Sequence, residues 1–154
     1  MSAQHTNLRV NPSDETIPAG NTSVHFLVTG ADSGGSMALF EFTIAAGTGL
    51  PVAHSHDGYE ETLYGIEGRS TWTVNGEPID IGPGQALCIP RGAAHAFMNH
   101  GAVDARLLAV ISPGILGPAY FREMGKIFAA AKGGPPDRAK AAEVMRRHGL
   151  TPAW

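Results

Sequence analysis

The sequence of 154 residues has a single cysteine, Cys88, no long apolar run and no cluster of basic residues. One cysteine allows no disulfide within the chain, and its place in the strand-like run ALCIP favours a buried small hydrophobe over a nucleophile. The longest apolar runs are too short to span a membrane, and the start, MSAQHTNLRV, lacks the features of a secretory signal. The formal net charge of −3 argues against nucleic acid or an anionic membrane as partner. We therefore expect a cytoplasmic protein that binds neither.

Glycine and proline, in contrast, are abundant, with 20 and 11 residues. They separate short segments in which polar and apolar residues alternate, which is the pattern of half-buried strands. This pattern starts at Ser23 and is clear over residues 39–44, and the Asn75-Gly76 pair is a strong hairpin signal. Further strands are expected over residues 50–56, 61–67, 69–74, 79–81, 86–89, 95–99 and 104–112. Such short, regularly spaced strands predict an all-β sandwich or barrel.

The composition changes after Ser112, where helical patterns replace alternation. A first helix is expected from Gly117-Pro118 to Gly133-Gly134, and a second from the capping residue Asp137 to His148. Their apolar stripes predict packing faces, and their basic residues, Arg138 among them, predict a solvated side. The expected organisation is an N-terminal arm over residues 1–22, a β-barrel over residues 23–114 and a helical segment over residues 115–154 packed on the barrel.

The stretch over residues 54–68 carries the clearest chemical signal. If His54 and His56 lie on one strand, the period of two directs both imidazoles to the same face. Asp57 and Gly58 favour a tight reversal, after which Glu61 can bring its carboxylate alongside. Imidazole and carboxylate together favour a divalent transition ion over calcium or magnesium. A His-x-His pair alone is also consistent with two solvated histidines.

A second motif follows in residues 84–99, where the spacing is Gly84, five residues, Pro90, one, Gly92, two, His95, three, Asn99. It resembles the second motif of the cupin family in every fixed position. The first stretch, His-x-His, four residues, Glu, six residues, Gly, resembles the first cupin motif, which usually opens on a glycine; here Gly47 and Gly49 bracket that place. The resemblance implies a metal held by His54, His56, Glu61 and His95. The six-residue gap to Gly68 selects Glu61 over the adjacent Glu60.

The resemblance also implies a fold, a cofactor and partners. The fold is a double-stranded β-helix, the jelly-roll cupin barrel, with one or two C-terminal α-helices. The cofactor is one divalent transition metal, which the residues leave open as iron, manganese, nickel, copper or zinc. The order PG, YFREM, GGPPD and a closing helix resembles the tail of small bacterial cupins related to quercetin dioxygenase. Small cupins are commonly dimers, so a homodimer that acts on a small molecule is implied.

Alternation from the predicted ligands also places an apolar pocket around the metal, lined by Val52, Leu63, Gly65, Trp72 and Phe97. The leading hypothesis is a metal-dependent dioxygenase or oxidase of a small aromatic or enolisable oxygenated substrate, with Glu61 as ligand and proton acceptor. The second is an isomerase or lyase that uses the metal as a Lewis acid and consumes no oxygen. The third is a binding cupin without turnover. The sequence does not choose among these hypotheses.

Overall fold

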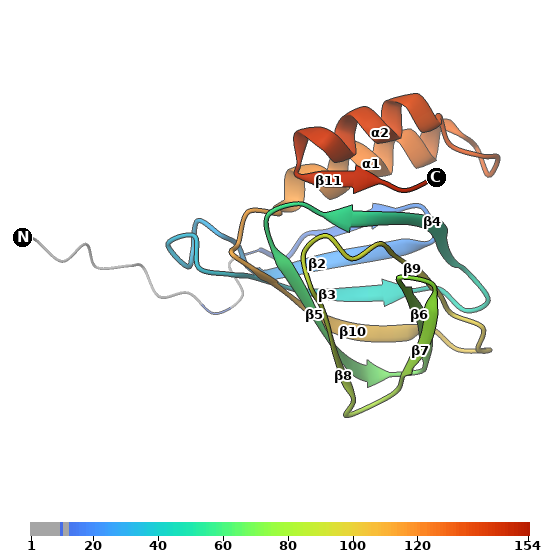
Figure 1. Cartoon of the computed structure of the whole chain (residues 1–154), viewed down its shortest axis with the longest axis horizontal. Coiled ribbons are helices and arrows are strands. Elements are labelled where there is room, and N and C mark those ends of the chain that lie inside the picture. Colours follow the sequence, from blue (N-terminus) through green and yellow to red (C-terminus); the bar gives the residue numbers. More distant parts are fainter. Residues whose placement is uncertain (1–9, 11–12) are drawn as a thin grey trace, which may run out of the picture.

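The computed structural model describes Val10 and residues 13–154. Two antiparallel sheets face each other as a barrel, and two helices lie along one side of it (Figure 1). The first sheet has the strand order β1-β2-β3-β10-β5-β8, and the second has the order β11-β4-β9-β6-β7. The strands are β1 (Thr16–Ala19), β2 (Thr22–Val28), β3 (Ala38–Ile44), β4 (Gly49–His56), β5 (Glu60–Glu67), β6 (Ser70–Val74), β7 (Glu77–Ile81), β8 (Ala86–Ile89), β9 (His95–Met98), β10 (Ala105–Ser112) and β11 (Leu150–Pro152), and the helices are α1 (Pro118–Ala130) and α2 (Arg138–Arg147). The predicted all-β jelly roll with C-terminal helices is confirmed.

The core lies between the sheets and continues under the helices. β3 and β10 are paired over their whole length and bury every second residue, as the alternation in their sequences predicts. Phe40 on β3 packs against Phe26 on β2 and Phe121 on α1, with ring centroids 4.8 and 5.3 Å apart. Buried residues of the barrel and of both helices form one continuous cluster. The helices are therefore part of the same core as the barrel.

Two short strands add to the predicted pattern. β1 lies within the expected N-terminal arm and pairs with β2, burying Ile17 and Ala19 while Pro18 stays exposed on the edge strand. The rest of the arm, apart from Val10 and the residues from 13 on, lies outside the described residues. β11 lies within the expected helical segment and pairs with β4, so that Leu150 is opposite His56. The chain therefore returns to the barrel after α2.

Cys88 is exposed, contrary to the expectation that it is buried. β8 is the last strand of its sheet, and it buries only Ile89 while its other side chains are exposed or half-buried. The alternation of an edge strand thus directs the thiol outward. None of the helices in the described residues is long and apolar enough to cross a membrane.

Candidate metal centre

Four buried side chains meet inside the barrel from three strands. His54 and His56 lie on β4, and His95 lies on the neighbouring β9, directly opposite His54 in the register. Glu61 lies on β5 in the facing sheet. The exposed fractions of these residues are 8% for His54, 2% for His56, 8% for Glu61 and 1% for His95. The structure thus brings together all four ligands that the motifs predict.

The three imidazoles are close enough to share one ion. Their candidate ligand atoms all lie within 4.8 Å of one another. Glu61 Oε2 lies 3.6 Å from His95 Nε2 and 3.9 Å from His56 Nε2, distances longer than those of normal hydrogen bonds. His95 Nδ1 lies 2.9 Å from the Ala93 carbonyl oxygen, a contact that suits an N–H donor and leaves Nε2 as a ligand atom.

Several nitrogen atoms of this cluster have no partner among the described residues. These atoms are His54 Nδ1, His56 Nδ1 and His95 Nε2. All three are buried, and none of them forms a hydrogen bond with a described residue. Buried polar groups are nearly always paired, so three unpaired imidazole nitrogens in one place need a ligand. The donor set, imidazole with one carboxylate and no thiolate, fits a divalent transition ion.

Burial and mutual contacts shift the pKa values of this cluster in different directions. Burial, followed by the charges of its neighbours, lowers the pKa of His54 well below its usual value. Burial also lowers the pKa of His56, to about 4. For His95, burial acts to lower the pKa but the Glu61 carboxylate outweighs it, so the pKa is raised. For Glu61, burial acts to raise the pKa but His95 and His56 outweigh it, so the pKa is lowered. Glu61 is therefore a carboxylate at neutral pH.

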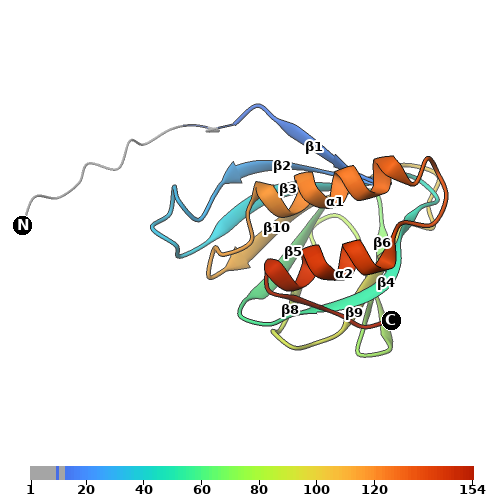
Figure 2. The same ribbon diagram turned by 90° about the horizontal axis from the view of Figure 1, so that it is seen from above.

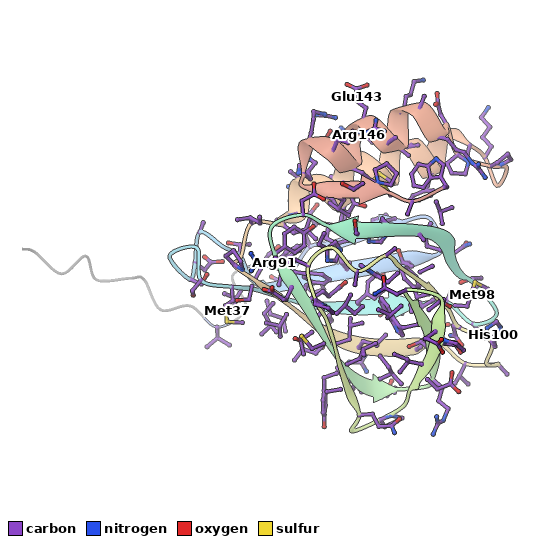
Figure 3. All side chains as sticks on the ribbon, in the orientation of Figure 1. Met37, Arg91, Met98, His100, Glu143 and Arg146 are labelled. Atoms are coloured by element: carbon purple, nitrogen blue, oxygen red, sulfur yellow. The ribbon has the colours of Figure 1, made fainter. Side chains whose placement is uncertain are left out.

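Glu60, the competing carboxylate, points out of the barrel. Arg91 donates two hydrogen bonds to it, from Nε at 2.6 Å and from Nη2 at 2.9 Å. Arg91 is exposed and lies in the loop between β8 and β9 (Figure 3). The alternation along β5 therefore separates the two glutamates, as the sequence predicts.

Asn99, the last residue of the second motif, is buried beside β9 but is not part of the cluster. Its amide nitrogen donates to the carbonyl oxygens of Ile44 and Val103, and its amide oxygen accepts from the Gly101 backbone N–H. These bonds fix the turn between β9 and β10. The motif thus combines a metal-binding histidine candidate with a residue that holds the backbone.

A cavity of about 360 Å³ opens onto the four side chains. Val52, Trp72 and Phe97, which were predicted to line a pocket, are among its lining residues. Leu63 and Gly65 do not. Leu63 points inward but is fully buried in the core, and a Cβ on Gly65 would lie 2.1 Å from the Gly82 carbonyl oxygen, because the barrel is closed there. Alternation gives the inward face of a strand but not the depth at which the cavity ends.

Another large part of the cavity wall comes from the C-terminal segment, where the sequence indicated packing faces on the two helices but no cavity. Its residues lie on α1, α2, β11 and the adjoining loops, which cover this side of the barrel when it is seen from above (Figure 2). Arg138, expected on the solvated side, is exposed and also borders the cavity. The aromatic residues in the apolar stripe of α1 were the available signal of this wall in the sequence. An apolar stripe, however, does not reveal whether the helix faces a solid core or a cavity.

A cupin domain model matches residues 40–111, which include all four side chains of the cluster. Over 74 residues the chain is 31% identical to quercetin 2,3-dioxygenase of Bacillus subtilis, a match that covers 48% of this chain and 21% of that protein. Over 60 residues it is 40% identical to the tetracenomycin polyketide synthase protein TcmJ of Streptomyces glaucescens, covering 39% of this chain and 40% of that protein. The chain therefore spans less than half the length of these relatives.

A similar solved structure is that of a predicted oxalate decarboxylase from Thermotoga maritima. Its TM-score is 0.59 at 23% identity, and the match covers 69% of this chain and 99% of that one. At this identity the likeness concerns the fold. Both sequence motifs fall inside the span that the domain model matches, on the strands that converge on the histidines. The chain belongs to the cupin family.

Proposed function

We propose that this protein is a metal-dependent dioxygenase or oxidase that acts on a small, ring-containing molecule with an ionisable oxygen. The observation that carries the proposal is the cluster of three buried imidazoles with unpaired nitrogens, next to a carboxylate, at the inner end of a largely apolar cavity. A buried charge and three unpaired imidazole nitrogens are costly in an apolar interior unless a ligand compensates them.

His54, His56, His95 and Glu61 would hold the metal, which is iron, manganese, nickel, copper or zinc. When bound, the ion would act as a Lewis acid toward a substrate oxygen and, if redox-active, would supply the electron chemistry that dioxygen requires. Glu61 has a second role in this proposal. Its carboxylate would accept the proton of the substrate hydroxyl at Oε1 or Oε2, because its pKa is lowered and it is ionised at neutral pH.

The walls of the cavity support the same reaction class. Phe42, Trp72 and Phe97 pack as a group beside the histidines, with ring centroids 4.9 to 6.3 Å apart. Such walls exclude water from a reactive anion and offer flat surfaces to a ring. The volume is at the small end of the range of about 300–1,000 Å³ that is typical of small-molecule sites. A relative named quercetin 2,3-dioxygenase gives further support for oxygen chemistry.

The first experiment is elemental analysis of the purified protein and of three variants. His54→Ala and Glu61→Gln should reduce the metal content from about one ion per chain to near zero, because second-shell changes alone cost about 10- to 100-fold in affinity and direct ligands cost more. His100→Ala is the matched control, since His100 is exposed and outside the cluster (Figure 3). Equal metal content in all four proteins would overturn the proposed centre.

The second experiment follows oxygen consumption with a panel of phenols and enols. We expect turnover in air that stops under nitrogen and is absent from His54→Ala. Turnover at the same rate under nitrogen would overturn the oxygen reaction in favour of an isomerase or lyase. Binding of panel compounds without any turnover, by protein loaded with each of the five metals, would favour a binding cupin.

A further inference from the structure

The C-terminal part of the chain makes up much of the wall of the cavity. Its hydrophobic and aromatic residues lie on four consecutive pieces of the chain: Leu116; Tyr120, Phe121, Met124 and Phe128 on α1; Ala141 and Met145 on α2; and Leu150 and Trp154 at the C-terminal end. The exposed Arg138 and the loop residues 134–136 border the same cavity but are not counted in this set. Figures 1 and 2 show these elements together on one side of the barrel. We call this set the C-terminal wall. It lies outside the span that the cupin domain model matches.

The C-terminal wall is almost wholly apolar. Within the set just defined, only Tyr120 and Trp154 carry a polar side-chain atom. Trp154 is 43% exposed, whereas Tyr120 is 6% exposed. A hydroxyl in such surroundings discriminates between ligands, because a few well-placed polar groups fix the orientation of a ligand in an apolar pocket.

Tyr120 is held by its neighbours through its ring and not through its hydroxyl. The ring makes edge contacts with Phe121 and His148, at centroid distances of 5.0 and 5.6 Å. Among the described residues no hydrogen bond involves the Tyr120 hydroxyl. Unlike the Tyr59 hydroxyl, it is not among the fully buried side-chain atoms that lack a partner. Burial, and then the charge of Glu61, raises its pKa, so the phenol stays protonated and can donate. A phenol that borders an apolar cavity can donate to a molecule bound there.

The other two tyrosines differ from Tyr120 in informative ways. Tyr59 is fully buried and its hydroxyl is also unpaired, but it is not among the residues that line the cavity. Its ring stacks on the His56 ring, with the ring centroids 4.5 Å apart. Tyr64 is 47% exposed on the outward face of β5. Of these tyrosines, Tyr120 is the one that faces the cavity.

We propose that the C-terminal wall selects the substrate, and that the Tyr120 hydroxyl donates a hydrogen bond to a second oxygen of the bound molecule. The substrate is thus a small, mainly apolar ring compound with oxygen substituents at two separated positions. One oxygen lies at the histidine and glutamate cluster, and the other accepts from Tyr120. This inference rests on the proposed function in one respect: the proposed function also places the substrate in this cavity.

The test is isothermal titration calorimetry on the protein as purified, under nitrogen so that no turnover occurs. The probes are 2,7-dihydroxynaphthalene, which has an oxygen on each ring, and 2-naphthol, which has one. Tyr120→Phe should raise the Kd of the diol by about three- to tenfold, as expected for one lost hydrogen bond, and should change the Kd of 2-naphthol by less than about twofold. Tyr64→Phe is the matched control and should change neither value.

Thermal unfolding of both variants checks that the fold is retained. An unchanged Kd for the diol in Tyr120→Phe would overturn the assignment of this hydroxyl, and so would equal losses for the diol and 2-naphthol. Failure of the diol to bind the wild-type protein would overturn the proposed substrate class. The readout is independent of the oxygen reaction. Loss of oxygen turnover with an intact Tyr120 effect would reject only the proposed function, and the reverse result would reject only this inference.

Discussion

The barrel and the C-terminal segment border the same cavity but supply different chemistry to it. The barrel contributes three histidines and a glutamate, carried on β4, β5 and β9, together with the aromatic residues beside them. The C-terminal segment contributes mainly apolar side chains from α1, α2 and β11. The domain model of the family matches residues 40–111, and so covers the first group and none of the second. The part that this chain shares with its family is therefore the part suited to hold an ion.

The two regions are nevertheless joined at the centre itself. β11 pairs with β4, and Leu150 is opposite His56 in the register. Buried residues of α1 and α2 belong to the same continuous core as the barrel strands. A change in the C-terminal segment can therefore alter stability and the shape of the cavity while the ligand strands stay intact. This division, with the candidate ion-binding residues in the barrel and a large part of the cavity wall in the C-terminal segment, can be tested by substitution.

The largest effect is expected from truncation of a core residue in α2. Met145 is 1% exposed and borders the cavity. Met145→Ala should lower the free energy of unfolding by about 2–5 kcal/mol, because it removes buried contacts and enlarges an existing cavity. The metal content of the folded protein should stay the same. Chemical denaturation followed by circular dichroism, with elemental analysis of the same samples, measures both.

Glu143→Ala is the matched control for this substitution. Glu143 lies on the same helix but points away from the barrel (Figure 3), and exposed changes of this kind usually stay within about 0.5 kcal/mol. Two separate unfolding transitions in the wild-type protein would contradict a shared core. A loss of metal in folded Met145→Ala protein would show that the C-terminal segment also sets the geometry of the ligands.

The sequence predicted the barrel better than the C-terminal wall, for a physical reason. His54, His56 and Glu61 follow from motif spacing and strand alternation, which are local properties, and alternation also explains why Glu60 faces outward. β1 and β11 are too short for alternation to show, and each contains a proline. The stripe on α1 predicts a buried face but not what it faces. Leu63 shows the same limit, because its inward direction was predictable and the end of the cavity was not.

A smaller effect, confined to the barrel, is expected from pH. In the metal-free protein, His54 and His56 have a pKa below that of the unfolded chain, so the unfolded state takes up more protons as the pH falls. Stability should therefore be complete above the unfolded pKa of 6.5 and should decrease as the pH falls toward about 4. His56 alone can account for up to about 3 kcal/mol of this loss.

The raised pKa of His95 acts in the opposite direction, since its contribution is largest at low pH and is lost as the pH rises. Because the pKa is lowered for two of these histidines and raised for one, we expect a net loss of folding stability as the pH falls. Urea denaturation of metal-free protein at pH 7, 6 and 5 measures it. His56→Phe should flatten the slope, whereas His100→Ala should not. A stability that is constant or increases toward pH 5 would contradict the assigned protonation states.

The smallest effect is expected at Tyr59, where the two regions meet. Its hydroxyl is buried without a partner among the described residues, and the ring lies close to the Gly149 turn between α2 and β11. Tyr59→Phe keeps the stacking on His56 and removes a polar group that has lost its contact with water. The free energy of unfolding should rise by up to about 1 kcal/mol, and the melting temperature by about 2–4 °C. A decrease would mean that a buried water bonds the hydroxyl, which would make the contact between barrel and C-terminal segment a hydrated one that Phe cannot replace.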